Sequence, residues 1–318
     1  MTANCATHKY EKVFNSKRAI SKLRILVLGY SGFFGRHFLK YCQSKEHELI
    51  LVGRAPSPVL LSARDFWVQS EITDFQSKLD KFGKIDALAN FVWQGLPRRT
   101  TELNQMNLIL HSKILSQVRE MPFSKVLCVG SCLEYPLSNR NLVETSPVDK
   151  ENEFSKTKSK VLEMYMETFE NVVWPRVFFA YGSGQHKDSL LNTAFDSFIN
   201  NLDLVLRSPS ELQDYVHITD VVRAFEMLIS KTDCQGIFNV GSGVGVKNGK
   251  ICDVLLDLMR NPGHSLRQKE RVSLSKISDA NQSLFRVADI SKIRREVGWD
   301  PQIDVEKGIY EFLKSKCK

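Results

Sequence analysis

One face of a predicted helix carries an aromatic ring and an ammonium group one turn apart. Residues 151–160 read ENEFSKTKSK, so Phe154 precedes Lys158 by four positions. In a helix this spacing puts both side chains on the same face. A hydroxyl on that ring would be a proton donor beside a cation, but phenylalanine has no hydroxyl. The stretch is therefore either a surface helix with an incidental Phe or an active site that lacks one atom.

Three glycines follow the first apolar segment at a spacing that suits phosphate binding. Gly29, Gly32 and Gly35 lie in GYSGFFG, directly after RILVL and before a helical pattern. Glycine permits a tight turn and close approach of the backbone, and the helix N-terminus attracts a pyrophosphate. In this setting the motif predicts a dinucleotide site. We assign cofactor contacts to the whole turn: Gly29, Ser31, Gly32, Phe33, Phe34 and Gly35.

The end of the second predicted strand indicates which dinucleotide is bound. A carboxylate there would accept hydrogen bonds from the ribose hydroxyls of NAD, but this strand ends in VGR. Arg54 can instead pair with the 2′-phosphate of NADP. The sequence therefore predicts NADP rather than NAD, and the alternative is that Arg54 is a solvated surface residue. Ile72, farther along the chain, is included among the cofactor-binding positions.

Buried strands and helices alternate on both sides of these motifs. The strand patterns RILVLG, ELILVG, KIDALANFV and KVLCVGS are separated by helical stretches that end near Ser44, span about 102–118 and begin near Glu153. Such alternation is typical of a parallel sheet with helices on both faces. We also predict strands in NVVWPRVFFAYG and GIFNVGS, helices near 189–200 and 219–231, and a last amphipathic helix from about Val305.

The predicted fold class is α/β, a doubly wound parallel Rossmann sheet with a smaller C-terminal substrate lobe. Residues 1–22 are polar and basic without periodicity, which predicts a flexible tail. Residues 23–178 would form the NAD(P)-binding Rossmann domain. Residues 179–318 would form mainly the substrate-binding lobe, with segments near 213–245 returning to the Rossmann domain.

Composition and charge limit the classes of function. Of the 318 residues, 42% are hydrophobic and 25% are charged, which is typical of a globular protein. The formal charge of +8 comes from dispersed Lys and Arg, so an anionic small molecule is favoured over nucleic acid. No apolar run reaches the ~20 residues that cross a bilayer, and no secretory h-region is present, so we expect a cytoplasmic protein without membrane contact. The seven cysteines lack paired CxxC spacing, which predicts reduced thiols and no metal site.

Six ordered motifs connect the chain to a known family. The glycine turn is followed by KVLCVGSCLEYP, FSKTK, PRVFFAYGSGQ, QDYVHITDVVRAF and NVGSG. Together they resemble the extended short-chain dehydrogenase/reductase class, the NAD(P)-dependent epimerase/dehydratase family that acts on nucleotide sugars. The resemblance covers residues 23 to about 314 and ends with VADISKIRREVGWDPQIDVEKGIYEFL. A softer likeness, in AYGSGQ and FVWQGLP, is to bacterial 4-keto-hexose reductases and epimerases.

The resemblance implies catalytic positions and one departure among them. The family has a Ser or Thr after the fourth strand and a YxxxK pair on the next helix, which match Ser131 and Lys158, with Phe154 at the tyrosine position. In the family the lysine binds the nicotinamide ribose and lowers the tyrosine pKa from ~10, and the phenol exchanges a proton as hydride moves. Loss of a general acid typically costs ~10²–10⁴ in rate. The resemblance therefore implies altered catalysis.

The loop that follows Ser131 offers candidates for a substitute acid. By the resemblance, this loop should face the nicotinamide. It contains Cys132, Glu134 and Tyr135. Each of the three is equally well explained as a loop residue that packs or meets solvent.

Other departures from the family restrict the expected reaction and the class of substrate. Cys132-Leu133 replaces the Asp-Glu pair of the dehydratase branch, so elimination of water is not expected. Gln213 replaces an arginine that commonly holds a substrate phosphate, and Arg207 either offers that charge or is a surface loop residue. Trp93 and Gln94, after the third strand pattern of this set, are candidates to line the sugar site, and the alternative for the aromatic residue is a place in the core.

The leading interpretation is an NADP-dependent reductase or epimerase acting on a nucleotide-linked sugar. The alternative is a non-catalytic NAD(P)-binding sensor or partner protein, which loss of the tyrosine favours, and nucleic-acid binding ranks last. Because the family commonly dimerises through the helix of Phe154 and the one near residues 103–118, the resemblance implies a homodimer. Met164 and Met166 would lie in that interface or in the core of the subunit.

Overall fold

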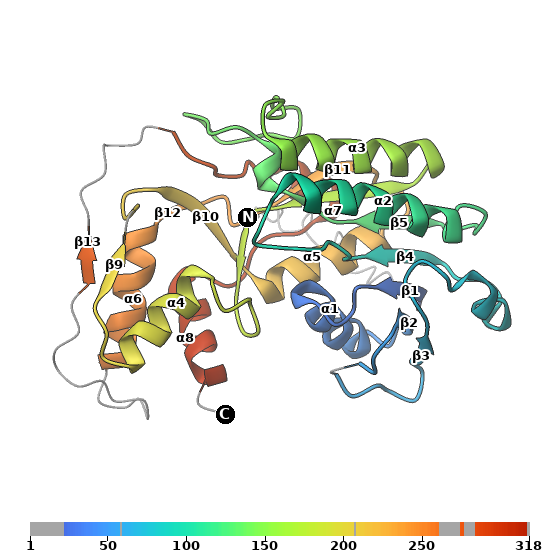
Figure 1. Cartoon of the computed structure of the whole chain (residues 1–318), viewed down its shortest axis with the longest axis horizontal. Coiled ribbons are helices and arrows are strands. Elements are labelled where there is room, and N and C mark those ends of the chain that lie inside the picture. The colour runs from blue at the N-terminus through green and yellow to red at the C-terminus, as the bar shows by residue number, and fades with distance from the viewer. Residues whose placement is uncertain (1–21, 58, 207, 261–273, 277–283, 317–318) are drawn as a thin grey trace, which may run out of the picture.

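The computed structural model describes residues 22–57, 59–206, 208–260, 274–276 and 284–316 (Figure 1). Residues 1–21 of the predicted tail and Arg207 lie outside the described residues. The described chain forms a large parallel sheet flanked by helices, with a smaller group of helices and short strands beside it.

The large sheet is parallel, as the alternating pattern predicts. Its strand order is β11-β7-β5-β4-β1-β2-β3, and β6 pairs with β7. The central strands β1, β4 and β5 are buried almost along their whole length, because a parallel sheet is covered on both faces. The chain extends the sheet outward from β1 in both directions, which confirms the doubly wound α/β fold. The strands are β1 Arg24–Leu28, β2 Glu48–Gly53, β3 Phe66–Gln69, β4 Ala87–Asn90, β5 Lys125–Cys128, β6 Gly130–Ser131, β7 Val172–Val177 and β11 Gly236–Val240.

Two pairs of helices cover the two faces of this sheet (Figure 1). Alternate residues of β1 point to opposite faces. Val27 packs in a core cluster with residues of α1 and α5, whereas Leu26 packs in a second cluster with residues of α2 and α3. These four helices are α1 Phe33–Ser44, α2 Thr101–Val118, α3 Glu153–Thr168 and α5 Ile218–Ser230.

A third core cluster lies in the later part of the chain, between helices α4, α6 and α8 and the short strands beside them. Strand β8 pairs in parallel with β10, and β12 pairs antiparallel with β10. Segments α5 and β11 belong to the large sheet region, although they follow β8 in sequence. The predicted division at residue 178 stays a prediction. The remaining elements are β8 Phe179–Tyr181, α4 Leu190–Ile199, β9 Leu204–Leu206, β10 Leu212–His217, β12 Gly245–Lys247, α6 Asn248–Arg260, β13 Leu274–Lys276, α7 Ser291–Val297, α8 Val305–Lys316 and the 3-10 turns η1 Gln76–Lys78, η2 Asp80–Phe82 and η3 Cys132–Glu134.

Two features of the described residues bear on membrane and metal binding. None of the helices placed there is both long and apolar enough to cross a bilayer. In the same part of the chain, no three His, Cys, Asp or Glu side chains gather as ligands for a metal ion. The five described cysteines are buried.

Candidate functional site

The glycine turn joins the carboxyl end of β1 to the N-terminus of α1. Gly29 has φ of +78°, and its carbonyl accepts a hydrogen bond from the Gly32 amide at 3.1 Å. A Cβ on Gly35 would collide with the Gly29 carbonyl and lie 2.6 Å from Tyr30 Cα. No side chain caps α1, so the amides of its first turn are left for a ligand. These residues fit a dinucleotide pyrophosphate.

Arg54 and Ile72 lie near the ends of β2 and β3, away from the pocket described below. The Arg54 side chain is 81% exposed, and its Nε lies 3.9 Å from the Glu71 carboxylate. Ile72 is partly buried and packs against the core cluster on the α2 and α3 side of the sheet. Arg54 is therefore free to meet a phosphate, in competition with Glu71.

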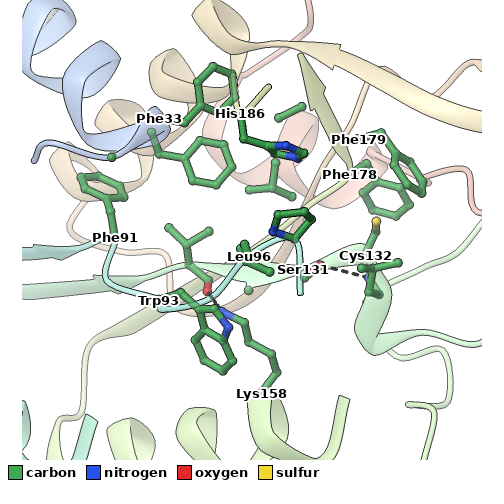
Figure 2. Close-up of a pocket in the computed structure, with 18 of the residues that line it drawn as sticks. Phe33, Phe91, Trp93, Leu96, Ser131, Cys132, Lys158, Phe178, Phe179 and His186 are labelled. Atoms are coloured by element: carbon green, nitrogen blue, oxygen red, sulfur yellow. Dashed lines mark hydrogen bonds between the residues drawn. The ribbon is translucent and has the colours of Figure 1, made fainter. Parts of the chain in front are cut away.

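A pocket of about 540 Å³ opens where the parallel strands end (Figure 2). The first turn of α1 lines it on one side, and residues after β4, β5 and β7 line the others. The pocket brings together seven of the residues that the sequence predicts: Gly32, Phe33, Phe34, Gly35, Ser131, Phe154 and Lys158. Gly29 and Ser31 belong to the turn but do not line the pocket. Trp93 does line it, next to Lys158 (Figure 2).

Lys158 is held from two sides. Its Nζ donates to the Val129 carbonyl at 2.8 Å and lies 3.6 Å from the centroid of the Trp93 ring. The residue is only 5% exposed, and this burial lowers the pKa of its ammonium to about 8. The contact with the indole offsets part of the cost of burying the charge.

Phe154 lies at the start of α3, where Asn152 caps the helix by accepting hydrogen bonds from the amides of Phe154 and Ser155. The Phe154 ring is 3% exposed and meets Trp93 edge to face, with 5.5 Å between centroids. The guanidinium of Arg99 lies 5.9 Å from the ring centroid. The ring thus lines the pocket as an apolar surface, one helical turn from Lys158.

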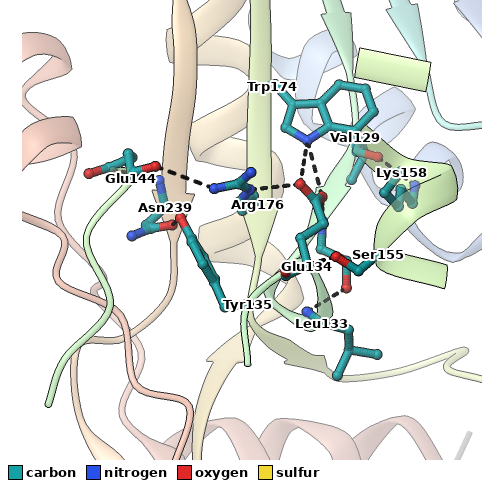
Figure 3. A network of polar contacts seen from close by, with 11 residues as sticks. Val129, Leu133, Glu134, Tyr135, Glu144, Ser155, Lys158, Trp174, Arg176 and Asn239 are labelled. Carbon is teal, nitrogen blue, oxygen red and sulfur yellow. Dashed lines mark hydrogen bonds and ion pairs between the residues drawn. The ribbon is translucent and has the colours of Figure 1, made fainter. Parts of the chain in front are cut away.

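Ser131 caps the 3-10 turn η3, and the geometry of this turn sets the directions of the side chains that follow. The Ser131 Oγ accepts from the Leu133 amide at 3.2 Å, and the Ser131 amide donates to Glu134 Oε1 at 2.7 Å. The Glu134 carboxylate is buried and accepts hydrogen bonds from Arg176 Nε at 2.7 Å and from Trp174 Nε1 at 3.1 Å (Figure 3). Glu134 is therefore directed into the protein.

Of the two interpretations left open for Glu134 and Tyr135, the structure favours packed loop residues over a substitute acid. Neither side chain lines the pocket. The Tyr135 hydroxyl donates to Asn239 Oδ1 at 2.9 Å, and burial raises its pKa to about 12 (Figure 3). Cys132 does line the pocket, but burial raises the pKa of its thiol to about 12 as well. The physical reason is η3, which turns two of the three side chains inward.

Some other predicted positions lie outside the pocket. Gln213 donates to Glu211 Oε1 at 2.9 Å, and neither Gln213 nor Gln94 lines the pocket. Met164 packs against the core cluster that α2 and α3 share, whereas Met166 is exposed.

Sequence reasoning missed three polar residues that line the pocket: Arg99, Gln185 and His186. Arg99 lies between β4 and α2, and the other two follow β8. The available signal was the stretch AYGSGQHK, since residues after the ends of parallel strands gather at one edge of the sheet.

Comparisons with known proteins identify the family of the chain. The family model described as NAD dependent epimerase/dehydratase family matches residues 25–241. The dTDP-6-deoxy-L-talose 4-dehydrogenase (NAD(+)) of Aggregatibacter actinomycetemcomitans is 24% identical over 236 residues, which cover 70% of this chain and 85% of that protein. The dTDP-4-dehydro-6-deoxyglucose reductase of Escherichia coli is 25% identical over 148 residues, 45% of this chain and 44% of that protein.

Solved structures match nearly the whole chain. The epimerase Mth375 of Methanothermobacter thermautotrophicus superposes with a TM-score of 0.78 at 17% identity, over 94% of each chain. DesIV, a dTDP-glucose 4,6-dehydratase of Streptomyces venezuelae solved with NAD bound, superposes with a TM-score of 0.77 at 21% identity, over 93% of this chain and 97% of that one. With a family model that matches more than half of its length, the chain belongs to the NAD-dependent epimerase/dehydratase family.

Proposed function

We propose that the chain is an NADP-dependent reductase or epimerase acting on a nucleotide-linked sugar, with catalysis altered by Phe154. The observation that carries the proposal is that Ser131, Phe154 and Lys158 line one pocket beside the N-terminus of α1. A bound nicotinamide cofactor would supply hydride chemistry in that pocket. Ser131 then orients the sugar oxygen, and Lys158 binds the nicotinamide ribose.

The names of two relatives support reduction at C4 of a deoxyhexose. One is a 4-dehydrogenase of a dTDP-6-deoxyhexose, and the other is a reductase of a dTDP-4-dehydro-6-deoxyhexose. The pocket walls favour such a sugar, since most side chains that line it are apolar. We therefore propose dTDP-4-dehydro-6-deoxyglucose as the first substrate to try. Elimination of water is disfavoured, because Cys132 has a pKa of about 12 where a dehydratase has a carboxylic acid.

The preference for NADP rests on Arg54. A charge-assisted contact between its guanidinium and a 2′-phosphate is worth ~1.5–3 kcal/mol, or about one to two decades in affinity. Glu71 competes with the phosphate for Arg54 at 3.9 Å in the free protein. The affinity for NADPH should therefore fall in Arg54→Ala and rise in Glu71→Gln, while the affinity for NADH stays unchanged in Arg54→Ala.

The experiment has two stages. NADPH and NADH are first titrated against the wild type and these two variants by the fluorescence of the reduced nicotinamide. The protein with NADPH is then mixed with dTDP-4-dehydro-6-deoxyglucose, and with NADP⁺ it is mixed with dTDP- and UDP-linked hexoses, while absorbance of the nicotinamide is followed. Equal affinity for both cofactors, unaltered in Arg54→Ala, would contradict NADP specificity, and no redox change across the panel would contradict the enzymatic proposal.

A second candidate function is cofactor binding without turnover. It is favoured by the packing of Phe154 and by the indole that covers the Lys158 ammonium. This candidate predicts tight NADPH binding with no change in nicotinamide absorbance in the presence of any sugar of the panel.

A further inference from the structure

The proposed site needs a proton source, since Phe154 supplies none. Reduction of a ketone adds a hydride to carbon and a proton to oxygen. Among the described residues that line the pocket there is no carboxylate, and four side chains carry a titratable nitrogen or sulfur: Arg99, Cys132, Lys158 and His186.

Three of these four are poor donors for physical reasons. A guanidinium such as that of Arg99 does not release its proton in proteins. The Cys132 thiol is buried, with a pKa of about 12. The Lys158 ammonium donates to Val129, is covered by Trp93 and is 5% exposed, so it is poorly placed to regain a proton from solvent after each turnover.

His186 differs from these three residues, because its backbone is held by hydrogen bonds while its imidazole is exposed to solvent. Its carbonyl accepts hydrogen bonds from Asn192 Nδ2 at 3.0 Å and from the Ser189 amide at 3.2 Å. Asn192 and Ser189 are both buried, so they fix the loop between β8 and α4. In the described chain no hydrogen bond or ion pair engages the His186 imidazole, which is solvent-exposed.

The imidazole enters the pocket on the side opposite Lys158 (Figure 2). A sugar bound in the pocket would lie between the two side chains. Histidine is the residue type that changes charge near neutral pH and can both give and regain a proton there.

We propose that His186 is the proton donor of this site, in place of the phenol that Phe154 lacks. The inference rests on the proposed function. As hydride adds to the carbonyl carbon, the π pair of the C=O bond moves to oxygen, which takes the proton from the imidazolium of His186. The carbonyl is reduced to an alcohol, the nicotinamide is oxidised, and the neutral imidazole takes up a proton from water. In the reverse direction His186 accepts the hydroxyl proton.

The test compares His186→Gln with Lys187→Gln, an exposed neighbour on the same loop that does not line the pocket. With NADPH and dTDP-4-dehydro-6-deoxyglucose, we expect kcat to fall by ~10²–10⁴ in His186→Gln. NADPH affinity should stay unchanged, and Lys187→Gln should match the wild type in both. Phe154→Tyr combined with His186→Gln should recover activity, because it restores the phenol.

The pH profile gives a readout that a structural role would not move. The wild-type kcat for ketone reduction should decline above the pKa of one group, and His186→Gln should lose that limb. The other titratable or charged groups near this loop are Arg99, Cys132 and Lys158 in the pocket, Arg36 and His37 of α1, and Lys187 and Asp188 beside it. All of these groups are retained in His186→Gln.

A readout without turnover uses NMR of ¹³C-labelled histidine. The His186 signal, identified by its loss in His186→Gln, should shift when dTDP-glucose is added to the NADP⁺ complex. A wild-type rate in His186→Gln, or no shift of this signal, would overturn the inference and leave the proposed function standing. Absence of wild-type turnover with every sugar of the panel would overturn the proposed function and the inference with it.

Discussion

The indole of Trp93 lies over the ammonium of Lys158, with 3.6 Å between Nζ and the ring centroid. The same indole contacts Phe154 edge to face and lies 5.6 Å from the His111 ring on α2. Trp93 therefore lines the pocket and covers the buried ammonium of Lys158. A cofactor whose ribose binds Lys158 must approach this ring.

Cofactor binding should therefore change the emission of Trp93. The chain has four tryptophans, all described, and Trp93 is the one that lines the pocket. NADP⁺ is the ligand to use, because reduced nicotinamide absorbs the emission of every tryptophan. We expect Trp93→Phe to remove most of the NADP⁺-dependent change in fluorescence, and Trp67→Phe to retain it. An equal loss in both variants would contradict the contact.

Lys158 should destabilise the folded protein at neutral pH. Its folded pKa of about 8 lies below the ordinary lysine value of 10.5, so the unfolded chain binds more protons between these values and stability rises with pH across that window. Below about pH 8 both states are protonated and the full penalty is present, on the order of 3 kcal/mol at most. Above about pH 10.5 both are neutral and the penalty is gone.

Lys158→Met should consequently raise the free energy of unfolding at about pH 7. The gain is smaller than the full penalty, because the contacts with Val129 and Trp93 are lost. Urea unfolding at about pH 7 and pH 10 measures it, and the difference between variant and wild type should shrink at the higher pH. A variant that is less stable at about pH 7, by an amount independent of pH, would contradict this expectation.

Glu134 should prove to be a structural residue. Its carboxylate and Arg176 form a buried ion pair at 2.7 Å, and Trp174 adds a further hydrogen bond. Glu134→Gln leaves the buried guanidinium uncompensated, which typically costs ~3–5 kcal/mol. Glu163→Gln, which breaks the exposed pair with Lys160, should cost ~0–1 kcal/mol. Urea unfolding compares them, and equal stability of the two variants would contradict the buried network.

These cases show which features sequence could predict. The glycine turn and the strands follow from local patterns. A Cβ at position 35 would collide with the Gly29 carbonyl, so a glycine there indicates a tight turn, and an apolar run such as RILVL indicates a buried strand. The direction of Glu134 depends on Arg176 and Trp174, which arrive on β7 some 40 residues later. A loop after a strand end has no periodicity that would tell an inward side chain from one that faces the pocket.

Other features of the site could not be predicted for a related reason. His186 lies on a loop whose position depends on Asn192 of α4, and the contact between Trp93 and Lys158 joins residues that are 65 positions apart in sequence. Such pairings arise only when the sheet brings strand ends together. A family motif identifies site residues at the motif's own positions. It gives no information about residues outside the motif, such as His186, that the fold brings to the same pocket.

The α2–α3 face should mediate a homodimer. Met106 and Ile109 of α2 are 51% and 57% exposed, and Met166 of α3 is 45% exposed, on two helices that pack side by side. Burying such side chains against a second copy removes apolar surface from water. We expect a dimer by sedimentation velocity at micromolar concentration, and Ile109→Glu should shift it toward monomer. Leu60→Glu, at an exposed site remote from these helices in sequence, should leave the dimer intact; a monomeric wild type would refute the proposal.

The last prediction concerns Phe154 itself. Phe154→Tyr adds one hydroxyl to a ring that lines the pocket a turn from Lys158, whose positive charge favours the ionised phenol. If chemistry is limited by proton transfer, kcat should rise by up to ~10²–10⁴, and the gain should be larger in the His186→Gln background. Phe179→Tyr adds the same hydroxyl on another wall of the pocket and should give no gain.

The measurement is the rate of NADPH oxidation with dTDP-4-dehydro-6-deoxyglucose, with NADPH affinity as the check on folding. A gain in Phe154→Tyr alone means that the pocket still has the geometry in which a phenol, Ser131 and Lys158 act together. Equal rates in Phe154→Tyr and the wild type, in both backgrounds, would mean that the ring does not meet the reacting oxygen.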